Sequence, residues 1–513
     1  MKNLVKTILI LVFFTINGLA QTQKPNIIII YADDLGYGDV SAYKKGVLKT
    51  PNIDRLANGG VRFTNGYASS ATCTPSRYAM LTGIYPWKNP KAKILTGDAP
   101  LIIDTNLETL PKVLKKANYK TAVIGKWHLG LGNGKLDWNE SITDNTNDVG
   151  FDYSFIMAAT TDRVPTVYIE NRKVLGLQSN DPLLVSYEKN FENEPTAITN
   201  PELMTKQKWH HGHNQSVYNG IPRIGFMKGG KSALWVDEDM ADVFSNRAVS
   251  FIENNNANKT GNPFFLYYAL HQPHVPRVPH PRFVGKSGMG ARGDAILEAD
   301  WCVGEILKKL ESEKILDNTL ILFSSDNGAV INDGYYDQAV EKLGNHTPSG
   351  GLRGGKYSLF EGGAKVPFIA YWKGKIKPGV SNALICQIDF MASLAKLVGT
   401  VAPESDSQEL LNVLLGKSNK GRSDLILEAS GKLAYRQGNY AFIPPYKGKP
   451  MHTEVNIELG ISPNFQVYNL SLDPAQKQNL SKLEPKKLEE LKKGMQKIIG
   501  DAFQINQNEL ELK

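Results

Sequence analysis

The sequence predicts an α/β fold in which helices sandwich a large, mainly parallel sheet, followed by a smaller antiparallel sheet that a C-terminal helix covers. Three observations lead to this prediction: nearly continuous apolar runs, helical patterns between those runs, and a change of pattern near residue 400. Apolar runs without alternation are typical of strands that a parallel sheet buries on both faces. A chain of 513 residues is also long enough for more than one domain.

Four apolar runs rich in β-branched and aromatic residues end abruptly in polar residues. They are residues 26–31 before Asp33 and Asp34, residues 119–125 before Lys126 and His128, residues 263–270 before His271 and His274, and residues 319–324 before Asp326 and Asn327. A ligand of an open α/β sheet binds beyond the carboxyl ends of its strands. We therefore expect these polar residues to meet in one pocket; the alternative is that each cluster only begins a polar loop.

Three segments have the pattern of helices that connect parallel strands. Thr50 and Pro51 begin the first, Thr109 precedes the second, and residues 294–310 form the third. Residues 141–232 lack this rhythm and are rich in Asn, Pro and Gly. They are predicted to form long loops over the strand ends, where specificity usually resides.

The C-terminal region has a different pattern. Short strand-like pieces at 424–429, 432–437, 440–444 and 466–470 precede a Lys/Glu-rich helical segment that begins at Pro485. This order predicts a small antiparallel sheet packed by a terminal helix. The predicted organisation is a signal segment at residues 1–20, a large domain at residues 21–400 and a C-terminal subdomain at residues 401–513.

Residues 1–20 have the composition of an export signal. Lys2 and Lys6 precede an apolar run at residues 8–16, and Gly18 and Ala20 follow it. The run is too short to span a membrane, and no later stretch is long enough. We predict a periplasmic or secreted protein without a transmembrane segment after signal removal, the alternative being a signal that stays as an anchor.

The net charge of +8 falls by two when the signal is removed, because that segment holds two lysines and no acidic residue. Acidic and basic residues alternate along most of the chain, so the charge predicts no nucleic-acid partner and is compatible with an anionic substrate. Three widely spaced cysteines do not suit a disulfide scaffold. Cys302 and Cys386 lie in apolar patterns and are predicted to be core residues, whereas Cys73 lies among hydroxyl residues.

The strand-end residues have a defined chemistry. Asp33, Asp34, Asp326 and Asn327 are oxygen ligands without a clustered Cys/His set, which favours Ca²⁺ or Mg²⁺ over Zn²⁺. Lys126, His128 and Lys356 add cationic and proton-transfer groups. Together they suit a multiply anionic group such as sulfate or phosphate. Taken singly, an Asp-Asp pair is also common in turns and a lysine is also common on a solvated surface.

The segment from Cys73 to Arg77, CTPSR, matches the C-x-P-x-R signature of type I sulfatases, and GIYP follows it at 83–86. Further blocks are similar to those of the family and in the same order, including DDLGYGD at 33–39, GKWHLG at 125–130, HQPH at 271–274, SSDNG at 324–328 and GGKYSLFEGG at 354–363. The chain thus resembles the formylglycine-dependent sulfatases of the alkaline-phosphatase superfamily, and in particular bacterial polysaccharide sulfatases.

This resemblance implies that a maturation enzyme converts Cys73 into formylglycine. One hydroxyl of the aldehyde hydrate would attack sulfur, and the other would lose its proton as sulfate is expelled and the aldehyde re-forms. The resemblance also implies a Ca²⁺ held by Asp33, Asp34, Asp326 and Asn327 together with residue 73. Arg77 would orient the formylglycine, and Lys126 would contact both it and the sulfate.

The resemblance further implies that His128 is a base, that His274 is the general acid, and that Lys356 binds sulfate. The substrate would be a sulfated glycan with a galactose or N-acetylgalactosamine type sugar, in mucin, glycosaminoglycan or algal polysaccharide. Predicted sugar contacts are Asp162, Arg163, His211 in the cluster with His210 and His213, His271, His346 and Arg353. A structural role is an equal alternative for His271 and for Arg353.

Three other functions compete with this prediction. A phosphonate or phosphate ester hydrolase of the same superfamily can share the nucleophile and metal framework. A glycan-binding protein without catalysis would have lost Cys73, Arg77 or a metal ligand, and all of these are present. A thiol protease would need a histidine partner for Cys73 and would have no use for four oxygen ligands.

Overall fold

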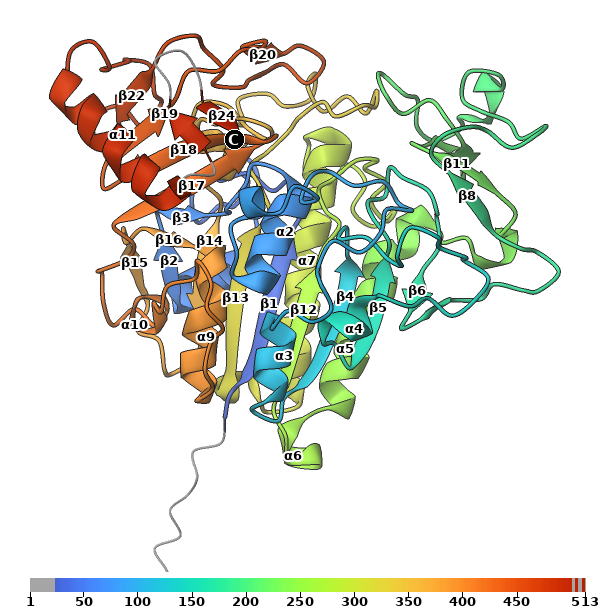
Figure 1. The fold of residues 1–513 in the computed structure, drawn as a ribbon. Coiled ribbons are helices and arrows are strands. Elements are labelled where there is room, and N and C mark those ends of the chain that lie inside the picture. The colour runs from blue at the N-terminus through green and yellow to red at the C-terminus, as the bar shows by residue number, and fades with distance from the viewer. Residues whose placement is uncertain (1–23, 501–502, 506–509, 513) are drawn as a thin grey trace, which may run out of the picture.

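The computed structural model describes residues 24–500, 503–505 and 510–512, so the predicted signal segment lies outside the described residues. The largest element is a ten-stranded sheet, with helices on both of its faces (Figure 1). Its strand order is β15-β2-β14-β13-β1-β12-β4-β5-β6-β7. The predicted α/β class, with a large and mainly parallel sheet, is confirmed.

The four predicted strands form the centre of this sheet. They are β1 (Asn26–Ala32), β4 (Lys120–Lys126), β12 (Phe264–Ala269) and β13 (Thr319–Ser325). They lie in the order β13-β1-β12-β4, and each neighbouring pair is parallel. Ile29, for example, lies in register with Tyr267 on one side and with Leu322 on the other. The carboxyl ends of all four strands therefore meet at one edge of the sheet.

Shorter strands complete both sides. β14 (Phe368–Tyr371) is antiparallel to β13 and leads to β2 (Val61–Phe63) and β15 (Gly379–Ser381). On the other side, β5 (Tyr153–Met157) is parallel to β4 and is followed by antiparallel β6 (Ile169–Glu170) and β7 (Lys173–Val174).

The strands β5 to β7 correct one prediction, because residues 141–232 were expected to be loops throughout. β5 is only five residues long, and the one helix between β4 and β5 is a single turn, α4 (Thr146–Val149). Neither is long enough to produce a recognisable periodicity. Much of the remaining segment is irregular, with two small strand pairs made by β8 (Leu184–Ser186) and β11 (Phe226–Lys228) and by β9 (Val217–Tyr218) and β10 (Ile221–Pro222).

The helices cover the two faces of the sheet in separate groups. Ile28 and Ile30 of β1 pack with α1 (Pro51–Gly59), α5 (Met240–Asn254) and α7 (Gly290–Ser312). Ile27 and Ile29 pack on the opposite face with α2 (Cys73–Thr82), α3 (Leu110–Lys115) and α9 (Phe390–Val398). Successive strand residues point to opposite faces, which explains why a doubly covered strand is apolar throughout. The three predicted helices correspond to α1, α3 and α7.

The four C-terminal strand-like pieces form the predicted antiparallel sheet. It consists of β17 (Asp424–Ala429), β18 (Lys432–Gln437), β19 (Tyr440–Ile443) and β22 (Gln466–Asn469). The helix α11 (Pro485–Ile499) buries Leu491, Met495 and Ile499 against it. Glu428 of β17 bridges to Ser70, so this sheet lies beside the start of α2 (Figure 1).

The remaining elements are short. They are β3 (Gly66–Tyr67), β16 (Ile385–Cys386), β20 (Met451–His452), β21 (Ile457–Glu458), β23 (Phe503–Ile505), β24 (Leu510–Leu512), α6 (Ala257–Thr260), α8 (Glu361–Ala364) and α10 (Leu411–Leu414). Val413 and Leu414 of α10 pack in the same core as α9. The 400/401 division stays a prediction, and this packing continues the large domain beyond it.

Two further observations bear on the sequence predictions. Cys302 and Cys386 are unpaired and buried in the core, as predicted, and Cys73 is also an unpaired, buried thiol. Across residues 24–500 and the two short strands that follow, no helix combines the length and apolar character needed to cross a membrane.

Candidate active site

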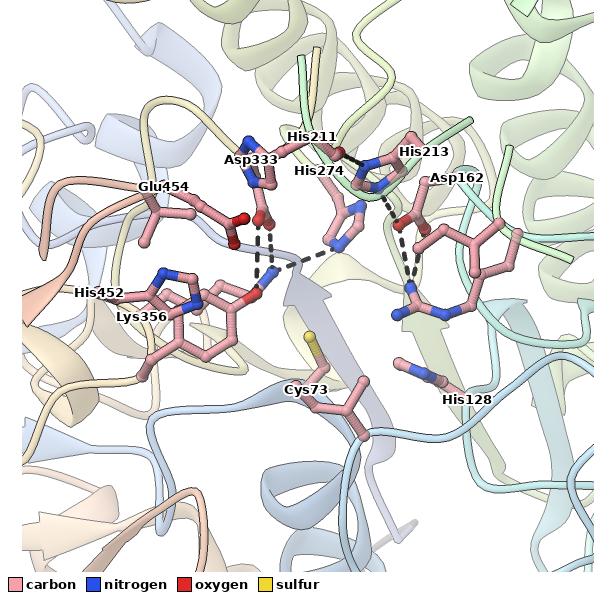
Figure 2. A pocket seen from close by; sticks show the side chains of 15 residues that line it. Cys73, His128, Asp162, His211, His213, His274, Asp333, Lys356, His452 and Glu454 are labelled. Atoms are coloured by element: carbon pink, nitrogen blue, oxygen red, sulfur yellow. Dashed lines mark hydrogen bonds and ion pairs between the residues drawn. The ribbon is translucent and has the colours of Figure 1, made fainter. Parts of the chain in front are cut away.

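A pocket with a volume of about 180 Å³ lies at the carboxyl ends of the central strands. Cys73, the first residue of α2, lies at its base, with His128 on one side and Lys356 on the other (Figure 2). The pocket is lined by Cys73, Ile94, His128, Asp162, Arg163, His211, His213, Ile224, His274, Asp333, Lys356, Tyr357, His452, Glu454 and Val455. The segments that contribute these side chains are far apart in sequence, as the strand-end hypothesis requires.

A buried cluster of oxygen atoms lies beside the thiol. Asp33 and Asp34 follow β1, and Asp326 and Asn327 follow β13, the neighbouring strand. The amide group of Asn327 donates to Asp34 Oδ1 at 2.7 Å, and the backbone N–H of Asp34 donates to Asp326 Oδ1 at 3.2 Å. The four residues therefore form one connected group.

Two acceptor atoms of this cluster have no hydrogen-bond partner among the described residues. They are Asp33 Oδ1 and Asn327 Oδ1, and both are buried. Ligand atoms of Asp33, Asp34, Cys73 and His274 also lie within 4.8 Å of one another. Buried acceptors without partners cost free energy unless something binds them. A hard divalent cation with oxygen ligands fits this set.

Buried cations neutralise the carboxylates. Arg77 donates from Nε and Nη2 to Asp326 Oδ2, at 3.0 and 2.7 Å, and Lys126 Nζ lies 2.7 Å from Asp33 Oδ2. Burial raises the pKa of Asp326, but Arg77 and Lys126 outweigh burial and lower that pKa to about 2. The Asp326 carboxylate is therefore ionised and holds Arg77 against the floor of the site.

His128 is arranged as a neutral imidazole. Its Nε2 lies 3.1 Å from the carbonyl oxygen of Leu95, an acceptor, so Nε2 carries the proton. Its Nδ1 is buried and has no hydrogen-bond partner within the described part of the chain. Burial lowers the pKa of His128 well below its usual value, and the nearby Lys126 and Arg163 lower it further. The ring thus presents a free lone pair at Nδ1.

His274 and Lys356 form a second proton-bearing pair. His274 donates from Nδ1 to the carbonyl oxygen of Val275 at 2.7 Å, and its Nε2 lies 3.4 Å from Lys356 Nζ. Lys356 Nζ also bonds Asp34 Oδ2 and Asp333 Oδ2, each at 2.9 Å. Burial and Lys356 lower the pKa of His274 well below its usual value. The lone pair on Nε2 therefore faces an ammonium group.

The opposite wall carries polar groups suited to a sugar (Figure 2). Arg163 Nη1 lies 3.0 Å from each carboxylate oxygen of Asp162, and His213 Nε2 lies 2.8 Å from Asp162 Oδ2. His213 Nδ1 bonds the carbonyl oxygen of His211 at 2.8 Å. The structure thus brings Asp162 and Arg163 into the pocket, together with His211 and His213 of the histidine cluster that the sequence singled out.

Three predicted sugar contacts do not line this pocket. His271 packs against Phe244, with ring centroids 6.0 Å apart. His346 Nε2 lies 2.8 Å from Asp39 Oδ1, in a network with Arg292. Arg353 pairs with Glu458 of β21, donates to the carbonyl oxygen of Gln476, and lies over the Phe360 ring at 4.0 Å. Nearness to Lys356 in sequence was a poor guide, because the chain turns between these residues.

His346 is therefore expected to act on stability rather than on substrate binding. Replacing His346 with alanine leaves one oxygen of the buried Asp39 without that partner, which should lower the free energy of unfolding by about 1–3 kcal/mol. KM for a sulfated sugar should not change. Thermal unfolding and initial-rate kinetics on the same preparation measure both effects, and a severalfold rise in KM without loss of stability would contradict the structural role.

Sequence reasoning missed several residues of the pocket. Asp333 lies on an irregular segment after β13, and Tyr357 follows the predicted Lys356. His452, the last residue of β20, and Glu454, in the turn between β20 and β21, come from the C-terminal region. Tyr357 lies within the matched block at 354–363, but the resemblance implies no role for it, and the other three residues neither end an apolar run nor belong to a matched block. The place of His452 and Glu454 became visible only when the C-terminal region packed over the strand ends.

Comparisons with known proteins agree with this geometry. A model of the family described as Sulfatase matches residues 25–400. The chain is 50% identical over 482 residues to N-acetylgalactosamine-6-O-sulfatase of Bacteroides thetaiotaomicron, with 93% of each sequence covered. It is 31% identical over 441 residues to Arylsulfatase A of Bos taurus, with 82% of this chain and 75% of that one covered.

Solved structures give the same result. One, from work on the metabolism of multiple glycosaminoglycans by Bacteroides thetaiotaomicron, has a TM-score of 0.90 at 50% identity and covers 93% of this chain and 99% of that chain. The PsFucS1 sulfatase from Pseudoalteromonas sp. has a TM-score of 0.68 at 26% identity, with 96% and 93% covered. The chain therefore belongs to the sulfatase family and is an enzyme of that family, as its sequence predicted.

Proposed function

We propose that this sulfatase removes the 6-O-sulfate from N-acetylgalactosamine in a sulfated glycan, using Ca²⁺ and a formylglycine made from Cys73. The observation that carries the proposal is the 50% identity, over 93% of each chain, to an enzyme named N-acetylgalactosamine-6-O-sulfatase. The pocket supports it, because Cys73, the cations Arg163 and Lys356, and the imidazoles of His128 and His274 line one small space. The predicted export and the predicted maturation enzyme belong to the same proposal.

The residues present fit both groups. Asp33, Asp34, Asp326 and Asn327 would hold Ca²⁺, and the two buried oxygen atoms without partners are the strongest support for this. Bound Ca²⁺ would stabilise negative charge, and the formylglycine would supply an oxygen nucleophile in place of a thiol. A plain thiol is a poor nucleophile here, since burial raises the pKa of Cys73 far above its usual value.

The chain's own cations bind the sulfate ester. Lys126 and Lys356 are almost completely buried, and each is held by a carboxylate at 2.7 to 2.9 Å. They are therefore fixed before the substrate arrives and need little reorganisation when charge develops on the sulfate oxygens. Arg77 is fully engaged with Asp326, Tyr267 and the backbone of Lys126, so its role is to hold the floor of the site.

Two imidazoles divide the proton transfers. His128 accepts a proton at Nδ1, the atom that has a free lone pair. His274 delivers a proton from Nε2 to the departing sugar oxygen. Lys356 Nζ, 3.4 Å away, keeps its own proton, because the effect of burial is outweighed by Asp333 and Asp34, which raise the pKa of Lys356 well above its usual value. The negative charge of a bound sulfate offsets the two lysines that lower the pKa of His274, so the substrate itself favours the protonated ring.

The polar wall made by Asp162, Arg163 and His213 selects the sugar. Asp162 still has acceptor capacity for a sugar hydroxyl, and Arg163 holds its carboxylate in place. The pocket volume of about 180 Å³ is below the ~300 Å³ at which typical small-molecule sites begin. It therefore favours one sugar unit with its sulfate over several units.

The proposed reaction is tested by sulfate release from single sugars. We expect release from N-acetylgalactosamine 6-sulfate at a kcat/KM at least about 100-fold above that for the 4-sulfate, because the site must place one sulfate against fixed charges. A phosphonate ester and a phosphate diester of nitrophenol serve as controls for the competing hydrolase chemistry. Equal rates on the 4- and 6-sulfates, or faster cleavage of the phosphonate, would contradict the proposal.

A further inference from the structure

A second cavity of about 530 Å³ adjoins the active-site pocket. It lies between residues 86–94 and residues 428–431, and we call it the Trp87 cavity. Ile94 lines both spaces, and Thr72 and Pro75, on either side of Cys73 in the sequence, line the Trp87 cavity. A group that leaves the active-site pocket past Ile94 therefore enters this cavity directly.

A third cavity, of about 440 Å³, borders the active-site pocket at Glu454 and Val455. The two neighbouring cavities differ in charge. The residues that line the third cavity include the carboxylate of Glu454 and no lysine or arginine. The Trp87 cavity contains Lys93, and its one acidic residue is the buried Glu428. An anionic group is therefore favoured in the Trp87 cavity and disfavoured in the third cavity.

Lys93 is available for a ligand, whereas Glu428 is not. The Lys93 ammonium has no ion pair and no hydrogen bond among the described residues, and the side chain is exposed. By contrast, the Glu428 carboxylate accepts from the Ser70 hydroxyl and from the backbone N–H of Gly431. The unpartnered charge in the Trp87 cavity is therefore positive.

The lining also has a rigid apolar part, beside the polar residues Thr72, Asn89 and Ser430. Trp87 stacks on Tyr85, with ring centroids 6.2 Å apart and planes 24° from parallel, and Pro86 and Pro90 lie beside it in the lining. Rigid aromatic and proline surfaces bind the apolar face of a sugar ring at low entropic cost. The cavity volume of about 530 Å³ lies within the ~300–1,000 Å³ range of small-molecule sites.

We propose that the Trp87 cavity binds the sugar next to the sulfated one, and that Lys93 makes it selective for an acidic sugar. The inference rests on the proposed function, because it places the sulfated sugar in the pocket of Cys73. The acidic neighbour bears a carboxylate or a second sulfate, and its ring packs against Trp87. The enzyme thereby binds two successive sugar units of a polyanionic chain, one in each cavity.

Three substrates and three variants test the inference. The substrates are N-acetylgalactosamine 6-sulfate alone, the same sugar linked through its reducing end to glucuronic acid, and the same sugar linked to glucose. The variants are Lys93→Glu, Trp87→Ala, and Lys91→Glu as the matched control. Lys91 is exposed on the same segment but does not line the cavity.

We expect Lys93→Glu to lower kcat/KM about tenfold for the acidic disaccharide only, since attraction becomes repulsion. Trp87→Ala should lower kcat/KM about tenfold for both disaccharides. Neither variant should alter cleavage of the single sugar, which also reports correct folding, and Lys91→Glu should behave as the wild type. The Lys93 effect should weaken as salt is raised from 0.05 to 0.5 M.

The outcomes separate this inference from the proposed function. If the enzyme releases sulfate from none of the three substrates, the proposed function is overturned and the inference with it. Sulfate release from the single sugar and the acidic disaccharide at equal kcat/KM, with no effect of Lys93→Glu, overturns the inference alone. An equal loss in Lys93→Glu and Lys91→Glu also overturns it, because the effect would then be one of overall surface charge.

Discussion

Replacement of Cys73 with alanine is expected to lower kcat for sulfate release by a factor of about 10⁴ or more, because it removes the atom from which the nucleophile is built. Binding should survive, since Lys126, Lys356 and the Asp162 wall remain in place. The thiol makes no hydrogen bond within residues 24–500, so stability should change by less than about 2 kcal/mol. Kinetics on N-acetylgalactosamine 6-sulfate and thermal unfolding measure the two effects.

Cys302→Ala is the matched control. Cys302 is equally buried but lies in α7, on the opposite face of the sheet from α2. Its loss should cost stability by leaving a small cavity and should leave kcat unchanged. Mass spectrometry of the peptide that contains residue 73 shows whether the wild-type enzyme carries the aldehyde. Sulfate release by Cys73→Ala at more than about one hundredth of the wild-type rate would refute the nucleophile assignment.

The second large effect is expected for Asp33→Asn, which should abolish stoichiometric calcium binding and lower kcat about 10³-fold. The change removes a negative charge from the oxygen cluster while keeping the shape of the side chain. Asp33 is also the partner of the buried Lys126, at 2.7 Å, but Asp326 Oδ2 lies 3.8 Å from the same ammonium and keeps a negative charge beside it. Because the loss of one partner of a buried ion pair is destabilising, thermal unfolding of the variant is measured beside its calcium content.

Calcium content by plasma mass spectrometry and activity after dialysis against a chelator are the measurements. Asp300→Asn is the control, because Asp300 is a buried carboxylate that accepts from the backbone N–H groups of Asn52 and Ile53, far from the pocket lining. It should lose stability but keep its calcium. An unchanged metal content in Asp33→Asn would remove Asp33 from the ligand set, and activity that withstands chelation would count against the metal itself.

Much of the site was predictable because its chemistry lies at strand ends. The apolar runs that became β1, β4, β12 and β13 are recognisable from composition, and the residues after them can only lie at the carboxyl edge of a parallel sheet. The CTPSR block marked Cys73 in the same direct way. Asp162 and Arg163 came from a segment without any periodicity, and the structure nevertheless places them in the pocket.

The sequence was least informative where a side chain had a choice of partners. His346 and Arg353 flank a Gly-rich turn before Lys356. The matched block marked Lys356, but no pattern shows whether His346 or Arg353 reaches the pocket. The structure shows that His346 is hydrogen-bonded to Asp39 and that Arg353 is paired with Glu458. Asp39 and Glu458 lie far from these residues in the chain, so their pairing depends on packing alone.

The sequence by itself determined the α/β class, the four central strands, the family and the chemical character of the strand-end residues. These depend on local composition and on short blocks, which one segment carries without help from another. The tertiary structure alone decided which nitrogen of His128 is free, which oxygen atoms lack partners, and that His452 and Glu454 of the C-terminal region close the pocket. Those properties arise from contacts between distant segments, and no local pattern encodes them.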